Sequence, residues 1–206
     1  MKMRQITVTE GLVELKTLDK RIYKAMEKQF IAVYMNAEKD SEKVKEFGKS
    51  AKANYQSVVD LIDERAKVKA AIVKSNAETE VTIGGKTMTV AEAIEKKSSI
   101  EYQKILHDKL KRAYADAVSI SVKQNNVVEG KIDRLLEALV SSDKTVSAED
   151  QKHTAEIYME SNGCFVSDPI GIQNEVDKLD KEITTFEAEV DTVLSISNAK
   201  TFITIE

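Results

Sequence analysis

Apolar residues recur at alternating intervals of four and three along residues 172–193 of this chain. The repeat consists of Ile172, Val176, Leu179, Ile183, Phe186, Val190 and Val193. This spacing is typical of a long helix that packs lengthwise against other helices. We expect the helix to begin at Asp168-Pro169, because proline suits the first helical turn, and to run to about Ile196. The alternating residues Thr201–Ile205 then predict a closing strand.

Acidic residues lie on both sides of this repeat and indicate which helix would pack against it. They are Glu175, Asp180, Glu182, Glu187 and Glu189. Two such helices side by side would set acid against acid, which opposes self-pairing. A basic partner within the chain is the first helix, with Lys16, Lys20, Arg21, Lys24 and Lys28. We therefore predict antiparallel packing of the first and last helices.

The N-terminal residues predict a short strand followed by a capped helix. Gln5–Val8 alternates apolar and polar types, and Thr7 with Glu10 has the spacing of a capping box. The helix is expected from about Thr9 to Met35. Its predicted buried face consists of Leu12, Leu15, Leu18, Ile22, Met26, Phe30 and Val33.

A polar break at Asn36–Ser41 precedes a second predicted helix, about Glu42–Ser75. Its expected face consists of Val44, Phe47, Ala51, Tyr55, Val58, Ile62 and Val73. Residues 80–89 then predict a β-hairpin, because Gly84-Gly85 suits a two-residue turn with positive φ at both positions.

Thr89 and Glu92 repeat the capping-box spacing and start a third predicted helix, Val90 to about Lys123. Its expected face consists of Ala91, Ile94, Ile105, Ala113 and Ala117. Gln124-Asn125-Asn126 either bends or ends this helix, so continuation past residue 126 is left open.

Residues 127–168 are interpreted as a distal helical subregion of the same chain. Val127–Ser141 is amphipathic, and Ser147 with Asp150 caps a shorter predicted helix. That helix is expected to end at Asn162-Gly163, with the glycine in the left-handed region. Cys164–Ser167 is expected to be extended or loop.

The elements together predict a mainly α fold. We expect residues 1–206 to form a single elongated domain, a bundle of long antiparallel helices. The N-terminal strand, the central β-hairpin and the C-terminal strand would form one small β-sheet at one end of the bundle.

Composition and charge narrow the function classes without naming one. The chain has 31 Lys and Arg against 35 Asp and Glu, interspersed along the helices. Without a basic stripe, nucleic acid is not an expected partner. No apolar run approaches a membrane span or a secretory signal, and the single cysteine fits a reducing compartment. We therefore expect a cytoplasmic protein with no membrane partner.

Residues 70–113 contain three short motifs, Ile72-Val73-Lys74-Ser75-Asn76, Gly85-Lys86-Thr87-Met88-Thr89 and Ala91-Glu92-Ala93-Ile94. On these motifs, this part of the chain resembles the DIP1984 or septicolysin-like family of bacterial and phage helical proteins. The resemblance implies a helical and oligomeric protein in which a hairpin separates two helices, with no catalytic residues to transfer. The general style of the sequence also looks like that of a phage protein.

Two short segments resemble sites of known chemistry, phosphate binding and nucleophilic catalysis, but neighbouring residues argue against both. Gly85-Lys86-Thr87 matches the end of a phosphate-binding loop, but Glu80 stands where that motif needs glycine. A carboxylate would repel phosphate, so a hairpin turn is expected instead. Cys164 lacks an identifiable base and is expected to be an inert thiol.

Other candidates are titratable or aromatic side chains on predicted helices. His107 beside Asp108 and His153 near Glu156 lack metal-ligand spacing, so both histidines are expected to be solvated. The carboxylates and bases at positions 60–67 predict an exposed, ion-paired face; they are Asp60, Asp63, Glu64, Arg65 and Lys67. Tyr102 and Tyr114 could line a cleft, but aromatic residues between packed helices usually belong to the core, so we expect both in the core.

The sequence therefore predicts no catalytic, cofactor-binding or metal-binding residues and no cofactor. We expect a non-enzymatic structural or assembly protein, such as a phage virion or morphogenesis component, that forms a homo-oligomer or a larger assembly. The alternative is an intracellular binding or inhibitor protein, for example in phage anti-defence, that sequesters a host protein or a small molecule.

Overall fold

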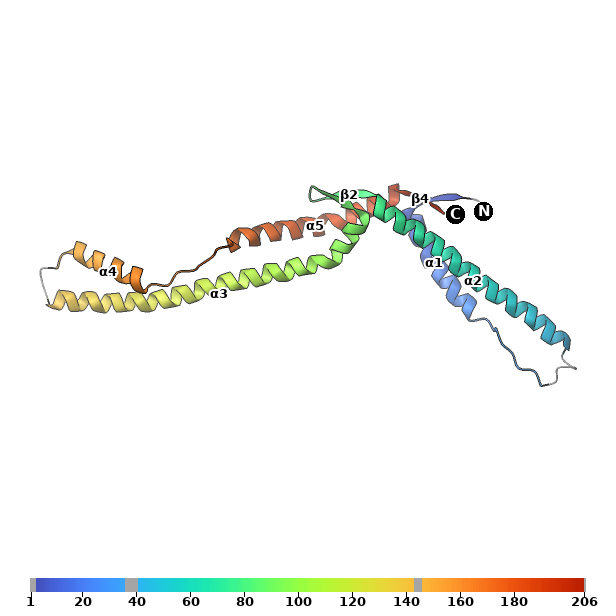
Figure 1. Ribbon diagram of the computed structural model, residues 1–206, viewed down its shortest axis with the longest axis horizontal. Helices are drawn as coiled ribbons and strands as arrows, with labels where there is room; N and C mark the ends of the chain where they lie inside the picture. The colour runs from blue at the N-terminus through green and yellow to red at the C-terminus, as the bar shows by residue number, and fades with distance from the viewer. Residues whose placement is uncertain (1–2, 36–40, 143–145, 206) are drawn as a thin grey trace. The chain divides into compact units, whose positions relative to one another are not determined.

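A computed structural model describes residues 3–35, 41–142 and 146–205, of which 79% are helical. Its elements are β1 (Arg4–Thr7), α1 (Val8–Met26), α2 (Ser41–Glu78), β2 (Glu80–Ile83), β3 (Lys86–Thr89), α3 (Val90–Ser142), α4 (Ala148–Asn162), α5 (Ile172–Lys200) and β4 (Phe202–Ile205) (Figure 1). The predicted mainly α fold with a hairpin and paired terminal strands is confirmed. The predicted polar break lies largely outside the described residues.

The chain divides into two compact units. Unit 1 comprises residues 1–99 and 185–206, and unit 2 comprises residues 100–184. All four strands of the described chain belong to unit 1. Helices α3 and α5 each contribute residues to both units.

The two chain ends meet in a small antiparallel sheet of unit 1. Strands β1 and β4 pair with Arg4 opposite Ile205 and Thr7 opposite Phe202. The Val8 N–H donates to the Thr201 carbonyl at 2.9 Å, which extends the pairing to the first helical residue. The predicted strands at both termini are therefore confirmed.

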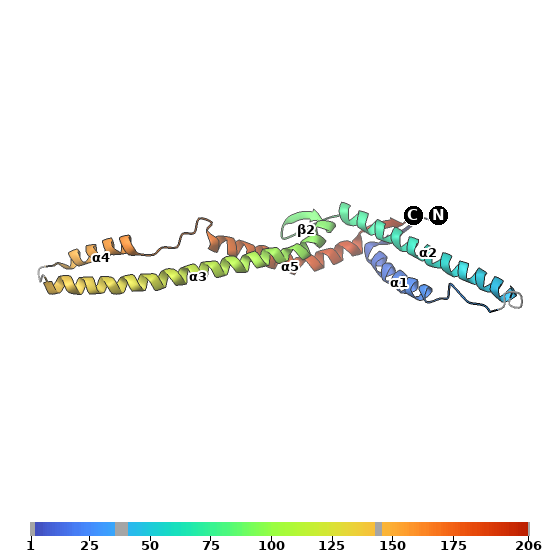
Figure 2. The ribbon, with the colours of Figure 1, turned by 60° about the horizontal axis from the view of Figure 1, so that its bottom comes forward.

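The core of unit 1 lies between α1, α2 and β4. Helices α1 and α2 run side by side in both views (Figure 2). Their buried apolar cluster consists of Val8, Leu15, Leu18, Val68, Ile72, Ile203 and Ile205. Burying such side chains contributes roughly 1.5–3 kcal/mol each, so this cluster fixes α1 against α2 and the terminal sheet.

Helix α1 begins as predicted but ends early, at Met26 instead of Met35. Thr7 and Glu10 form the expected capping box, and the Glu10 carboxylate accepts from the Thr7 N–H at 2.7 Å. These hydrogen bonds hold the pKa of Glu10 below its usual value. Beyond Met26, Phe30 and Val33 are exposed. No packed surface among the described residues covers their face, and aromatic and β-branched residues favour helix weakly.

Helix α2 forms where predicted, but the predicted face is partly wrong. Val44, Tyr55, Ile62 and Val73 are exposed, whereas Val58, Val68 and Ile72 are buried. The buried or half-buried positions alternate by three and four through Arg65. Arg65 is a charged residue in the middle of this face and interrupts its apolar pattern. The sequence therefore favoured a different face of α2.

The central hairpin has the predicted turn. Gly84 and Gly85 have φ of 57° and 74°, as a primed two-residue turn requires. Strands β2 and β3 pair only with each other, so the described strands form two separate two-stranded sheets instead of one. Each pair has its own apolar face to bury: Val81 and Ile83 are buried in β2.

A matched pair of glycine substitutions tests this turn. Gly85→Ala should lower the free energy of unfolding by about 1–2 kcal/mol, because alanine is strained at positive φ. Gly48→Ala, in the interior of α2 with open space around the added methyl group, should raise it by roughly 0.4–1 kcal/mol. Urea unfolding followed by circular dichroism measures both. Equal effects of the two substitutions would contradict the turn geometry.

Helix α3 continues without a break from Val90 to Ser142, which answers the question that Gln124-Asn125-Asn126 left open. Its capping box forms as predicted, since the Thr89 N–H donates to the Glu92 carboxylate at 2.7 Å. The predicted face is largely wrong. Ala91, Ile94, Ile105 and Ala113 are exposed, and only Ala117 is half-buried.

The apolar repeat of α5 is confirmed as a buried face, but its predicted partner is wrong. In unit 1, α5 lies against α3 and the hairpin: Lys96 lies 4.7 Å above the Phe186 ring, and Lys97 pairs with Asp191. The Gly84 N–H donates to Glu189 at 2.7 Å. Helix α1 packs on α2 instead. Helix α3 therefore supplies basic neighbours of α5, in place of α1.

The boundaries of α4 and α5 correct two predicted helix ends. Ser147 and Asp150 cap α4 as expected, and their hydrogen bonds lower the pKa of Asp150. Gly163, however, is extended, with φ of −67°. Helix α5 starts at Ile172 instead of Asp168-Pro169, because the Asp168 carboxylate accepts from the Gly171 N–H at 2.9 Å and the Ile172 N–H at 2.8 Å. Asp168 thus satisfies the helix start from outside it.

Candidate functional site

The inner face of α3 in unit 2 is unusually polar. Buried and half-buried positions alternate mostly by three and four along it. The row with this spacing consists of Ile100, Gln103, His107, Leu110, Tyr114, Ala117, Ser121, Asn125, Val128 and Ile132. Polar residues at such positions lower stability but can fix which partners pair and in what register. We call this set the polar face of α3.

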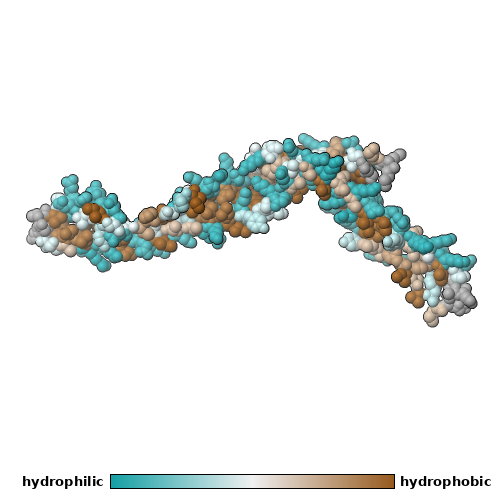
Figure 3. Space-filling model, in the orientation of Figure 1, coloured by the Kyte–Doolittle hydropathy of each residue, from teal (hydrophilic) through white to brown (hydrophobic). Residues whose placement is uncertain are grey.

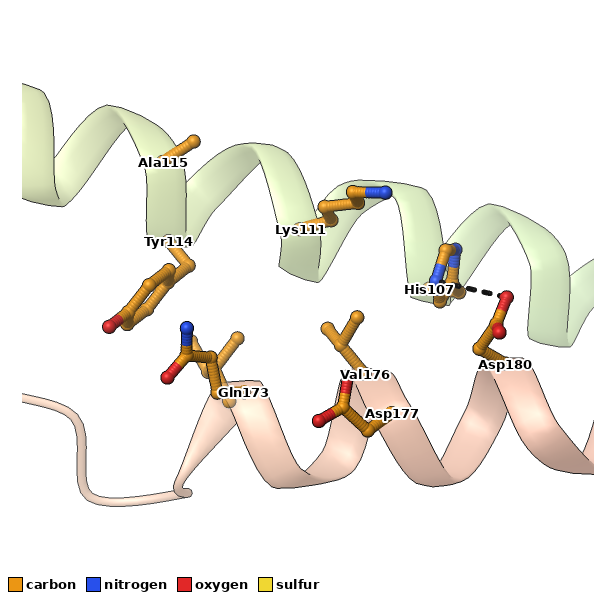
Figure 4. A pocket seen from close by; sticks show the side chains of 9 residues that line it. His107, Lys111, Tyr114, Ala115, Gln173, Val176, Asp177 and Asp180 are labelled. Atoms are coloured by element: carbon orange, nitrogen blue, oxygen red, sulfur yellow. Dashed lines mark ion pairs between the residues drawn. The ribbon is translucent and has the colours of Figure 1, made fainter.

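A groove of about 400 Å³ lies between the polar face of α3 and the first turns of α5 (Figure 4). It is lined by His107, Lys111, Tyr114, Ala115, Ile172, Gln173, Val176, Asp177 and Asp180. In the close view, Tyr114 and His107 reach from α3 toward Gln173, Val176 and Asp180 of α5. The volume falls within the range of small-molecule sites, roughly 300–1,000 Å³.

His107 is a titratable side chain that is largely enclosed in this groove. Its side chain is 14% exposed, and its Nδ1 lies 3.0 Å from an Asp108 carboxylate oxygen. Its Nε2 faces Asp180 across the groove at 3.9 Å. With Lys111 and Asp177 nearby, the groove presents both charge signs and several hydrogen-bonding groups. Such a lining suits a small polar ligand with both donors and acceptors.

The polar face also holds the segment that connects α4 to α5. The Asn125 side chain donates to the Cys164 carbonyl at 2.9 Å and accepts from the Cys164 N–H at 2.7 Å. The Ser121 hydroxyl donates to the same carbonyl at 3.1 Å. The Asn125 amide therefore binds the backbone as a neighbouring strand would, and it fixes the connecting segment on α3.

Removing this amide should release the connection. Asn125→Ala loses two hydrogen bonds, each worth about 0.5–1.5 kcal/mol net, and should increase hydrogen exchange of the Cys164 amide. Asn126→Ala, on the next and exposed position, serves as the control. Hydrogen exchange with mass spectrometry measures both, and unchanged protection of residues 163–167 in Asn125→Ala would contradict the assigned contacts.

The structure places the sequence candidates mostly as expected. Gly85-Lys86-Thr87 belongs to the hairpin, with Gly85 in its turn. His153 is exposed. His107 is not solvated as predicted, because it lines the groove. Cys164 has an exposed side chain and is held through its backbone.

The charged residues at positions 60–67 match the predicted exposed, ion-paired face only in part, because Arg65 is half-buried on the side of α2 that packs against α1. Arg65 pairs with Asp19 of α1, and this hydrogen bond raises the pKa of Arg65. Glu64 lies 3.6 Å from Arg4, and Asp60 accepts from Gln56 at 2.8 Å. The contacts of Arg65 and Glu64 join α2 to α1 and β1, and they indicate a structural role.

The two tyrosines differ from their shared prediction. Tyr102 is exposed on α3, whereas Tyr114 is half-buried in the groove. The sequence analysis did not identify five residues of the polar face of α3 and the adjoining groove. They are Gln103, Lys111, Ser121, Asn125 and Gln173. A repeat of three and four that admitted polar residues would have found most of the α3 members, but nothing in the sequence connects them to Gln173.

Within the described ranges, no group of three or more His, Cys, Asp or Glu side chains is arranged to hold a metal ion. No described helix is both long and apolar enough to cross a membrane. The chain matches no family model, no curated protein and no solved structure. The resemblance of residues 70–113 to the septicolysin-like family stays a prediction.

Proposed function

We propose that this chain is a non-enzymatic structural or assembly protein, acting as a homo-oligomer or as a subunit of a larger protein assembly. One observation carries the proposal: 27 large apolar residues of the described chain are exposed, against 21 buried hydrophobic ones. Apolar side chains reach the surface over several helices (Figure 3). Exposed apolar surface on this scale is typical of proteins that bury it against partners.

Helix α3 illustrates this exposure within one element. Tyr102, Ile105, Ile120 and Val127 are each more than half exposed. A single surface helix normally presents charged and polar residues outward. The same helix uses its polar face inward, so apolar residues are displaced to the outside. An assembly would bury them.

Sedimentation of the purified chain over a wide range of concentrations tests the proposal. We expect a mass greater than that of one chain, increasing with concentration. A monomer at every accessible concentration, together with absence from purified particles if the gene is phage-encoded, would overturn it. Recovery from such particles at a fixed stoichiometry would support a virion component.

The groove favours a second candidate function, a binding or inhibitor protein that sequesters a small molecule. The supporting observation is the polar lining of His107, Lys111 and Gln173 in a cavity of suitable volume. A thermal-shift screen of nucleotides and signalling metabolites tests it. A true ligand should raise the melting temperature increasingly with its concentration, and Lys111→Ala should remove that shift.

A further inference from the structure

The segment that follows α1 presents an apolar face with no described residue over it. Residues 31–35 alternate strictly between exposed and half-buried positions, as an extended strand does. The outward residues are Ile31, Val33 and Met35, which are 81%, 91% and 101% exposed. Inward, the Tyr34 ring lies edge-on to Phe47 of α2 at 6.4 Å. Such a segment normally turns polar residues outward, so this outward face indicates a covered surface.

Basic residues surround this apolar segment. Residues 29–35 contain no charge. Residues 20–35 contain four Lys or Arg against one Glu, and residues 41–55 contain four Lys against two Glu. This region is thus positive in a chain whose formal net charge is −4. We call residues 20–35 and 41–55 the basic surface.

Unit 2 has a surface of the opposite kind around the connection between α4 and α5. Phe165 and Ile170 of this connection are 84% and 63% exposed. Residues 147–184 contain nine Asp or Glu against three Lys. Two of these lysines already lie near carboxylates of their own helix, with Lys152 3.8 Å from Glu156 and Lys178 3.6 Å from Glu175. We call residues 147–184 the acidic surface.

We propose that the basic surface of one copy docks on the acidic surface of a second copy, with Ile31, Val33 and Met35 packing against Phe165 and Ile170. This inference rests on the proposed assembly function and names its interface. Charge complementarity selects the occupant, because two basic surfaces or two acidic surfaces would repel each other. The proposed arrangement is heterologous, so that each bound copy leaves one of its own patches available for the next.

The connection at Cys164 suits such a contact. Asn125 and Ser121 hold its backbone on α3, so Phe165 is presented from a fixed segment. A partner that docks there has less chain to order on binding. Cys164 is the only cysteine of the chain, which also makes it a site-specific reporter of the contact.

Oxidative cross-linking of full-length Val33→Cys is the first test. The new thiol should form a disulfide with Cys164 of another copy, giving a ladder of dimers, trimers and larger species on non-reducing gels. The wild type has one thiol and can give at most Cys164–Cys164 dimers. Val13→Cys is the control for an exposed position of α1 outside the basic surface, and it should give no efficient ladder. Disulfides confined to single chains in Val33→Cys would overturn the proposal.

Sedimentation of surface variants is the second test. Ile31→Ser/Val33→Ser/Met35→Ser should weaken self-association roughly tenfold or more, because central apolar anchors dominate most interfaces. The control Val13→Ser/Ile62→Ser/Val73→Ser removes three exposed apolar residues of α1 and α2 that lie outside the basic surface, and it should leave association unchanged. Circular dichroism confirms that each variant folds. If the wild type associates and only the control variant fails to, assembly stands but this interface is wrong.

Mixing two defective variants decides whether the contact is heterologous. The variant of the apolar segment keeps its acidic surface, and Phe165→Ser/Ile170→Ser keeps its basic surface. Each alone should be monomeric, and an equimolar mixture should form a dimer that grows no further. A mixture that stays monomeric would overturn the pairing of these two surfaces. Sedimentation of the wild type with phosphatidylserine vesicles but not with itself would assign the basic surface to a membrane instead.

Discussion

Replacing Ile72 with alanine is expected to lower the free energy of unfolding of unit 1 by about 2–5 kcal/mol, the range for truncating a large buried aliphatic residue. Ile72 is 2% exposed and belongs to the cluster that joins α1, α2 and β4. A methyl group added at Gly11 of α1 would lie 3.3 Å from the Ile72 Cδ1 and 3.0 Å from the Ile203 Cδ1. The helices are therefore so closely packed there that a cavity at Ile72 cannot easily collapse.

The neighbouring residue supplies the control. Val73→Ala removes apolar atoms from a side chain that is 53% exposed, so it should change stability by no more than roughly 0.5 kcal/mol. Urea unfolding followed at a helical wavelength measures both variants. The comparison also tests which face of α2 is buried, because the apolar pattern of the sequence had selected Val73. Equal losses for the two variants would contradict the observed packing.

The elements that the sequence predicted well are those with a local physical cause. The two threonine capping boxes need only residues three apart, and the Gly84-Gly85 turn needs only positive φ at two adjacent positions. The apolar repeat of α5 is uninterrupted, and its residues are buried or half-buried as expected. The pairing of β1 with β4 was also predictable, because both strands alternate and lie at the ends of the chain.

The faces of α2 and α3 were mispredicted for one shared reason. Their buried and half-buried positions include polar or charged residues, Arg65 in α2 and Gln103, His107, Ser121 and Asn125 in α3. Counting apolar residues therefore favoured a different, exposed side of each helix. Tertiary partners make these polar positions tolerable: Asp19 pairs with Arg65, and the Cys164 backbone pairs with Asn125. These partners are distant in the sequence, so they cannot be predicted from the local spacing of apolar residues.

The end of α1 shows the converse error, in which apolar residues at helical spacing do not form a helix. Phe30 and Val33 continue the helical spacing of Ile22 and Met26, yet the helix ends at Met26. Helix propensity alone rarely sustains such a stretch without a packed face. The structure instead places residues 31–35 in a segment outside the helices and strands, and the exposed residues of this segment are apolar. The apolar residues of this segment were predicted to form a helix face buried within the chain. Their exposure instead fits the intermolecular contact proposed above.

The second large prediction concerns Gln103. Replacing Ile72 should lower the free energy of unfolding, whereas replacing Gln103 with an apolar residue should raise it. The Gln103 Oε1 atom is buried and has no hydrogen-bond partner among the described residues. A buried unpaired polar atom costs roughly 1–3 kcal/mol relative to a partnered one. Gln103→Met replaces the amide with an apolar side chain of similar length. We therefore expect this substitution to raise the free energy of unfolding of unit 2 by about 1–3 kcal/mol.

A second substitution at the same position separates polarity from shape. Gln103→Glu keeps the shape but buries a carboxylate without a partner, so it should destabilise unit 2 at neutral pH and less so as the pH falls and the carboxylate is protonated. Thermal unfolding and hydrogen exchange of residues 100–110 measure both variants. Because Gln103 lies one helical turn from His107, a partner that fills the groove could also supply the missing hydrogen bond. A destabilising Gln103→Met would therefore indicate that this oxygen is satisfied in solution, which would assign the polar face of α3 a bound ligand or water instead of an intrinsic packing defect.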